Sequence, residues 1–113
     1  MSEALVEKLL RTGHLSVPER RALGTARWPT VLAVIERGLA SGWFPGPLVG
    51  DGEHAAIERT GAGYVVHEQH EIGVLRWGPV ERSEHPTLKA AVRAWLAACR
   101  WGRAIDGVPI ERP

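Results

Sequence analysis

The sequence predicts an α+β domain with N-terminal helices, a three-stranded antiparallel meander and a C-terminal helix packed on the sheet. Apolar residues recur at helical spacing before residue 42 and again after residue 87. Between them, short runs rich in β-branched and aromatic residues alternate with glycines. At 113 residues and 44% apolar composition, the chain is long enough to bury one core. We expect a single domain: a helical half over 1–42, a Gly/Pro-rich connection over 42–54, the meander and helix over 55–102, and a tail over 103–113.

Three helices are expected in the helical half. The first runs from Ser2 to about Thr12, where leucines and a valine fall on one stripe. A brief second helix covers 19–23, with Ser16 as its cap and a proline in its first turn. The third begins around Pro29 and places an apolar residue on one face at every turn until Gly42.

The connection reads as a rigid loop at 42–47, because each proline disfavours helix at the residue before it. The meander then follows. Strands are expected at 56–60 and 64–68, joined by a hairpin turn that holds two glycines. The third strand is expected at 72–78, with 80–82 as an edge extension.

The C-terminal helix is predicted most clearly. Ser83 or Thr87 can cap it and Pro86 suits its first turn. One stripe of this helix carries Leu88, Val92, Trp95, Leu96 and Cys99. Cys99 is the single cysteine, so it reads as a small core residue and no internal disulfide can form. The tail beyond residue 103 is expected to be extended and loosely held.

Charge and hydropathy argue against several partners. The 14 basic and 13 acidic residues leave no basic excess for nucleic acid, and the arginines at 20, 21 and 27 are a weak helix-turn-helix signal. No apolar run is long enough for a membrane span and no secretory signal pattern opens the chain. A cytoplasmic protein without a membrane partner or a cofactor is therefore expected.

The segment from His67 to Glu71 is the most suggestive of chemistry. Its two histidines are three residues apart, whereas the zinc-protease motif needs them four apart on a helix. A turn can still direct His67, His70 and Glu71 towards one metal ion. A small metal-binding protein or enzyme that uses these three residues is therefore the alternative hypothesis. The first hypothesis treats the histidines as structural or surface residues and the protein as no enzyme.

Acidic and aromatic side chains indicate a binding surface instead. Several glutamates lie at the end of the meander, where they form an acidic rim that suits a basic partner. Five tryptophans are a large share for this length, and indoles often anchor interfaces. Trp28 and Trp95 are expected in the core. The candidate partner-binding residues are Glu68, His70, Glu71, Trp77, Trp43 and Glu81.

The stretch 63–100 carries a family resemblance. It runs through Tyr-Val-Val-His-Glu, the strand Ile-Gly-Val-Leu-Arg-Trp, the polar segment 81–85 and the helix Leu-Lys-Ala-Ala-Val-Arg-Ala-Trp-Leu. This order resembles the strand–strand–helix ending of small bacterial immunity proteins from polymorphic toxin systems. The resemblance implies a non-catalytic protein that binds a cognate toxin and blocks its active surface, with a basic toxin surface as the partner.

Overall fold

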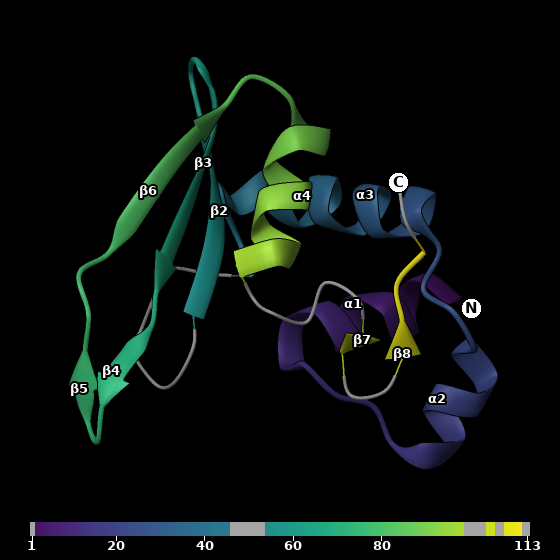
Figure 1. Ribbon diagram of the computed structural model, residues 1–113. Helices are drawn as coiled ribbons and strands as arrows, with labels where there is room; N and C mark the ends of the chain where they lie inside the picture. The colour runs from purple at the N-terminus through teal and green to yellow at the C-terminus, as the bar shows by residue number, and fades with distance from the viewer. Residues whose placement is uncertain (1, 46–53, 99–103, 106–107, 112–113) are drawn as a thin grey trace.

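The computed structural model describes residues 2–45, 54–98, 104–105 and 108–111, and it confirms the α+β class (Figure 1). Four strands form an antiparallel sheet in the order β1-β2-β3-β6. Two further strand pairs, β4-β5 and β7-β8, stand apart from that sheet. No helix in these described ranges is long and apolar enough to cross a membrane. The elements are α1 Ser2–Thr12, α2 Val17–Leu23, α3 Trp28–Gly38, the 3-10 turn η1 Leu39–Ser41, β1 Trp43–Phe44, β2 His54–Thr60, β3 Gly63–Gln69, β4 Glu71–Gly73, β5 Arg76–Trp77, β6 Glu81–His85, α4 Leu88–Ala98, β7 Ala104–Ile105 and β8 Val108–Pro109.

The three N-terminal helices match the predicted positions. Gly13 ends α1 with a positive φ of 82°, and its N–H donates to the Leu9 carbonyl. Ser16 caps α2 in a capping box, since its hydroxyl accepts from the Glu19 N–H while the Glu19 carboxylate accepts from the Ser16 N–H. Lys8 of α1 forms an ion pair with Glu19 at 2.9 Å. Thus the α2 cap also ties α2 to α1.

The core lies between the sheet and the helices. In Figure 1, α4 lies against one face of the sheet, α3 lies on the other side of α4, and α1 and α2 are furthest from β6. Trp95 of α4 is 1% exposed, meets the Phe44 ring edge-on and donates from Nε1 to the Ala55 carbonyl at 3.0 Å. Trp28 is buried as well. The predicted core role of both tryptophans is confirmed.

The sheet differs from the expected three-stranded meander at both edges. Residues 43–44, expected in a loop, form β1 and pair with residues 57–58 of β2. The expected third strand, 72–78, was wrong, because the chain reverses within it and forms the β4–β5 hairpin. The strand that pairs with β3 is instead β6, at 81–85. Its side chains are polar and nearly all exposed, so they carry no apolar alternation to predict a strand.

Residues 108–111 of the tail pack against the segment between α2 and α3. The expectation of a loosely held tail was wrong for residues 108–111, because Val108 and Ile110 are buried in the core. Ala26 donates to the Pro109 carbonyl and accepts from the Glu111 N–H, which forms a parallel bridge.

At the start of α4, Thr87 rather than Ser83 is the cap, since its hydroxyl accepts from the Ala90 N–H. Cys99 lies outside the described residues.

Candidate functional site

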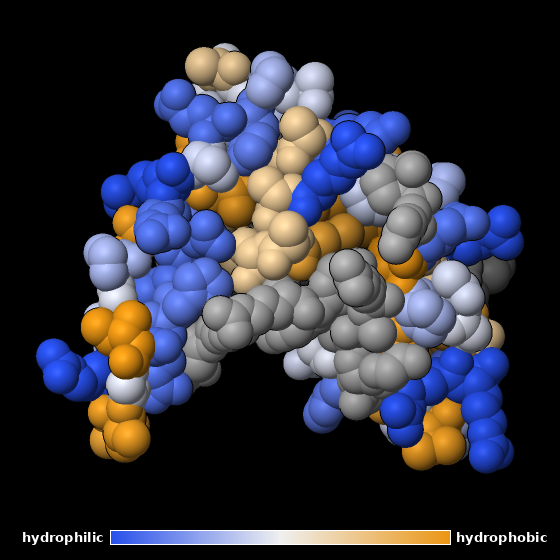
Figure 2. All heavy atoms as spheres, in the orientation of Figure 1, coloured by the Kyte–Doolittle hydropathy of each residue, from blue (hydrophilic) through white to orange (hydrophobic). Residues whose placement is uncertain are grey.

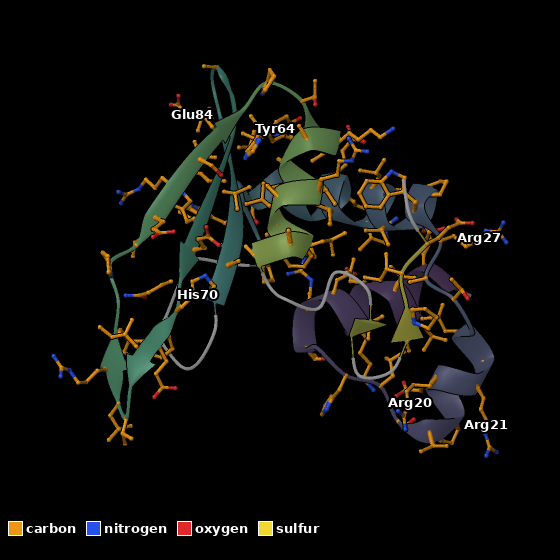
Figure 3. The ribbon with its side chains drawn as sticks, in the orientation of Figure 1. Arg20, Arg21, Arg27, Tyr64, His70 and Glu84 are labelled. Atoms are coloured by element: carbon orange, nitrogen blue, oxygen red, sulfur yellow. The ribbon has the colours of Figure 1, made fainter. Side chains whose placement is uncertain are left out.

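Five of the six predicted partner-binding residues lie where β3 and β6 meet the β4–β5 hairpin. Glu68 of β3 lies directly opposite Glu81 of β6, and Glu71 of β4 lies opposite Trp77 of β5. His70 joins β3 to β4, at the base of the hairpin in Figure 3. The fold therefore brings together side chains that are up to thirteen positions apart in the sequence. Trp43 is the exception.

Hydrogen bonds at its base hold the hairpin to the end of the sheet. The Gly78 N–H donates to the His70 carbonyl at 2.9 Å, and the Gln69 side-chain amide donates to the Gly78 carbonyl at 2.9 Å. Gly78 is buried, and a Cβ placed there would come within 3.0 Å of the Ile72 side chain. The hairpin is therefore anchored at its base, while its tip extends beyond the sheet (Figure 1).

The tip of the hairpin exposes an apolar cluster, which we call the tip cluster: Ile72, Val74 and Leu75. Their side chains are 67%, 89% and 88% exposed, respectively. Figure 2 shows apolar atoms at the end of this projecting arm, next to hydrophilic ones. Isolated exposed apolar residues are common on protein surfaces, whereas three of them grouped on one projecting element indicate a contact site.

Leu75 also has an unfavourable backbone conformation. Its φ is 55°, and among the described non-glycine residues it is the one with a positive φ. Leucine pays roughly 1–2 kcal/mol for this region, because its Cβ crowds the following carbonyl. The Glu71 carboxylate accepts from the Leu75 N–H at 3.0 Å and so stabilises the turn. Glu71 thus has a structural contact in the hairpin that the sequence did not indicate.

Two carboxylates lie opposite each other at the base of the hairpin. Two carboxylates directly opposite each other in a sheet repel, as Glu68 and Glu81 do. His70 Nε2 lies 3.2 Å from Glu68 Oε2, so the imidazole is a hydrogen-bond partner that offsets part of this repulsion. His70 Nδ1 is buried and has no partner among the described residues. Both side chains of the pair are about 30% exposed and remain reachable from solvent.

A second cluster occupies the outer face of the sheet, opposite the face that α4 covers. Trp43 lies over His67, with 4.8 Å between ring centroids, and His67 Nε2 lies 3.0 Å from Glu58 Oε1. His67 is 7% exposed, and Trp43 is half-buried. Trp43 is therefore part of a packed ring pair on the outer face, separate from the hairpin base.

The metal-binding alternative needs His67, His70 and Glu71 to converge, and they do not. His67 bonds to Glu58, His70 to Glu68, and Glu71 to the Leu75 N–H. Within the described part of the chain, no group of three histidine, cysteine, aspartate or glutamate side chains is placed to hold a metal ion.

Two surface hollows lie away from the hairpin. One, of about 200 Å³, lies at the opposite end of the sheet, near Tyr64 and Glu84 in Figure 3. The other, of about 420 Å³, lies between α1, α2 and α3 and is lined in part by Arg27 and Glu111. Arg20 and Arg21 lie on α2, on the far side of the molecule from His70 (Figure 3). Neither of these two hollows borders the predicted partner-binding residues, whereas a third, of about 310 Å³, is lined by Glu71, Gly73 and Val74.

Sequence reasoning missed the tip cluster, which is the most exposed apolar feature of the described residues. The run Ile-Gly-Val-Leu-Arg-Trp has the composition of a buried strand, and its turn contains no asparagine, aspartate or glycine at the two central positions. A weak signal was present, since Gly73 and Gly78 both interrupt the expected strand.

No protein-family model, curated protein or solved structure matches this chain.

Proposed function

We propose that the protein is a non-catalytic binding module that uses the β4–β5 hairpin to engage another protein. The observation that carries the proposal is the tip cluster. Burying three such side chains against a partner would remove apolar area from water, at about 25 cal/mol per Å². The hairpin is held at its base by hydrogen bonds, so little conformational freedom of the base is lost on binding.

The strained turn supports the same proposal. A leucine at φ 55° is less favourable than a glycine or asparagine there, and its exposed side chain does not contribute to the core. Folding therefore does not account for the leucine at this position. Backbone strain of this kind is concentrated at ligand clamps and contact sites. A partner pocket that accepts the leucine side chain would offset its cost.

The charge at the hairpin base specifies the kind of partner. Glu68 and Glu81 face each other at the base of the hairpin, and Glu71 lies on the hairpin itself. A basic surface around an apolar pocket would complement this arrangement. We propose a cognate bacterial toxin as this partner, in line with the resemblance to immunity proteins, and inhibition by occlusion of its active surface.

The test is direct binding between the purified chain and the purified product of the adjacent gene, measured by calorimetry. The double variant Ile72→Ser/Val74→Ser should weaken binding at least about tenfold, because it removes apolar contacts at the centre of the interface. Raising the salt concentration should weaken binding further, because the hairpin base contributes charge. Protection of the partner's target from the partner's activity should fall in parallel.

Val17→Ser is the matched control. Val17 is an exposed valine on α2, 49% accessible, on the other side of the molecule from the hairpin. This variant should bind like the wild type. Equal affinity of the wild type and the hairpin double variant, with both folded by circular dichroism, would refute the hairpin as the contact element.

A further inference from the structure

Strand β6 has a free edge. It is the last strand of the order β1-β2-β3-β6, and Figure 1 shows it at the outer margin of the sheet. Among the described residues, nothing pairs with the edge of β6 that faces away from β3. An unpaired edge presents N–H and carbonyl groups that another strand can bind.

The alternation of hydrogen bonds identifies the residues whose backbone groups point to this edge. The Arg59 N–H donates to the Gly42 carbonyl, on the β1 side of β2, and the Ala55 carbonyl accepts from Trp95 rather than from β3. The backbone N–H and carbonyl groups of odd-numbered residues in β2 therefore point away from β3, and those of even-numbered residues point towards it. Glu58 pairs with Val65, so odd-numbered residues of β3 bond to β2 and even-numbered ones bond to β6. Val66 in turn pairs with Ser83, so residues 81, 83 and 85 of β6 bond to β3. The backbone groups of residues 82 and 84 therefore point to the free edge.

The sequence of β6, Glu-Arg-Ser-Glu-His, is complementary to itself when it runs antiparallel. A two-fold axis at Ser83 places Arg82 of each copy opposite Glu84 of the other. The same register places Glu81 opposite His85. Residues 82 and 84 then exchange four backbone hydrogen bonds across the axis, with two opposite-charge pairs directly over them.

Other two-fold registers are unfavourable. The axis can also lie at Arg82 or at Glu84, because residues with edge-facing backbone groups then still lie opposite each other. The first position sets arginine against arginine at the axis, and the second sets glutamate against glutamate. Like charges directly opposite each other destabilise a strand pair. Charged side chains on an edge normally deter pairing, but here they select one partner and one register.

From this edge geometry we infer that the chain forms a symmetric dimer, in which β6 pairs antiparallel with β6 of a second copy across a two-fold axis at Ser83. The two four-stranded sheets become one continuous sheet, and the two-fold axis places the two hairpins at its opposite ends. This inference does not rest on the proposed function, because the register depends on residues 82 and 84 of β6 and not on the tip cluster.

The experiment measures the molar mass of the full chain by sedimentation equilibrium at concentrations from about 1 μM to about 1 mM. The wild type should be a dimer at the upper concentrations. Arg82→Glu and Glu84→Arg should each raise the dimer Kd at least about tenfold, because each creates two like-charge pairs across the axis.

An equimolar mixture of these two variants should associate again. In the mixed dimer, the glutamate introduced at position 82 of one copy lies opposite the arginine introduced at position 84 of the other. The second pair across the axis keeps its native residues, so both pairs are complementary. Glu36→Arg, an exposed reversal on α3, is the matched control and should leave the wild-type Kd unchanged.

A second readout does not depend on charge. In the Cys99→Ser background, Ser83→Cys places two thiols across the axis in a non-hydrogen-bonded pair, where Cα atoms are about 4.5 Å apart. A disulfide tolerates this separation, so mild oxidation should give a covalent dimer, whereas Cys99→Ser alone should not. A monomeric wild type throughout the range would overturn the inference. So would a dimer that neither reversal weakens, or reversals whose mixture stays monomeric while circular dichroism shows both folded.

Discussion

Trp95 and the tip cluster use apolar side chains in opposite ways. Trp95 is enclosed by the sheet and helices and has a hydrogen-bond partner for its indole N–H. Val74 and Leu75 stand in solvent on a hairpin whose backbone departs from a favourable conformation. The first arrangement stabilises the fold, and the second contributes little to it. The difference separates the residues that determine the fold from those available for contact.

The largest expected effect comes from removing the core residue. Trp95→Ala should lower the free energy of unfolding by about 3 to 5 kcal/mol, since it leaves a cavity and an unpaired Ala55 carbonyl. The hairpin variant Ile72→Ser/Val74→Ser should change the free energy of unfolding by less than about 1 kcal/mol, because both side chains are mostly exposed to water. Denaturant unfolding of both variants checks the comparison. A similar loss in both would show that the hairpin is part of the cooperative core.

A single added methyl group should destabilise the protein in tight surroundings and have little effect in open ones. Gly38→Ala adds a Cβ that would overlap the Phe44 ring. It should cost about 1 to 3 kcal/mol, although alanine favours helix by about 1 kcal/mol over glycine. Gly61→Ala, in the β2–β3 turn, meets no atom within 4 Å and should be close to neutral. Melting temperatures of the two variants give the answer, and equal values would contradict the tight packing at Phe44.

At the hairpin tip, relief of the unfavourable backbone conformation of Leu75 predicts a gain in stability. Leu75→Asn should be neutral or stabilising by up to about 1 kcal/mol, because asparagine tolerates a positive φ better than leucine does. The same substitution removes an apolar contact and should weaken partner binding. Calorimetric unfolding and partner titration of one sample measure both effects. A clear loss of stability would mean that Leu75 has a packing role in the folded chain.

The smallest effect concerns pH and the α2 cap. The Ser16 backbone N–H and the Lys8 ammonium lower the pKa of Glu19 from 4.5 to about 2. The folded state therefore favours the ionised carboxylate more than the unfolded state does. The resulting contribution to the free energy of unfolding is fully present above pH 4.5. It is lost as the pH falls from about 4.5 to about 2. The stability difference between the wild type and Glu19→Gln should shrink across this window, as followed by denaturant unfolding. A constant difference would disprove the linkage.

Local signals were enough to predict the helices and the β2–β3 hairpin. The capping box at Ser16 and the glycines at 13 and 24 act within one or two turns of chain, so the sequence displays them. The tip cluster was missed for the opposite reason. Its turn uses Leu75 in a region that leucine rarely adopts, so residue type argued for a continuous strand.

Pairing between strands that are distant in the sequence accounts for the other differences between the predicted and the observed sheet. Residues 43–44 become a strand only because β2 lies beside them, and the polar β6 becomes one only because β3 offers its edge. Five of the six residues that the sequence suggested for partner binding lie together in the structure, and their role in binding stays a prediction. Trp43 could not be excluded from this set, because its position on the outer face depends on the β1–β2 register.

The bridge between Ala26 and the tail bears on the order of folding during synthesis. The Trp28 N–H is bonded to the Glu111 carboxylate, 83 residues later in the chain, and Ala26 is bonded to residues 109 and 111. The ribosome makes these partners after both the helices and the sheet. The N-terminal helices therefore emerge before residues 108–111, which bond to Ala26 and Trp28 and add Val108 and Ile110 to the core. Folding of the helical layer should therefore be completed late. Chains that stop before residue 108 should be less protected from proteolysis around Ala26 than chains that include residues 108–111.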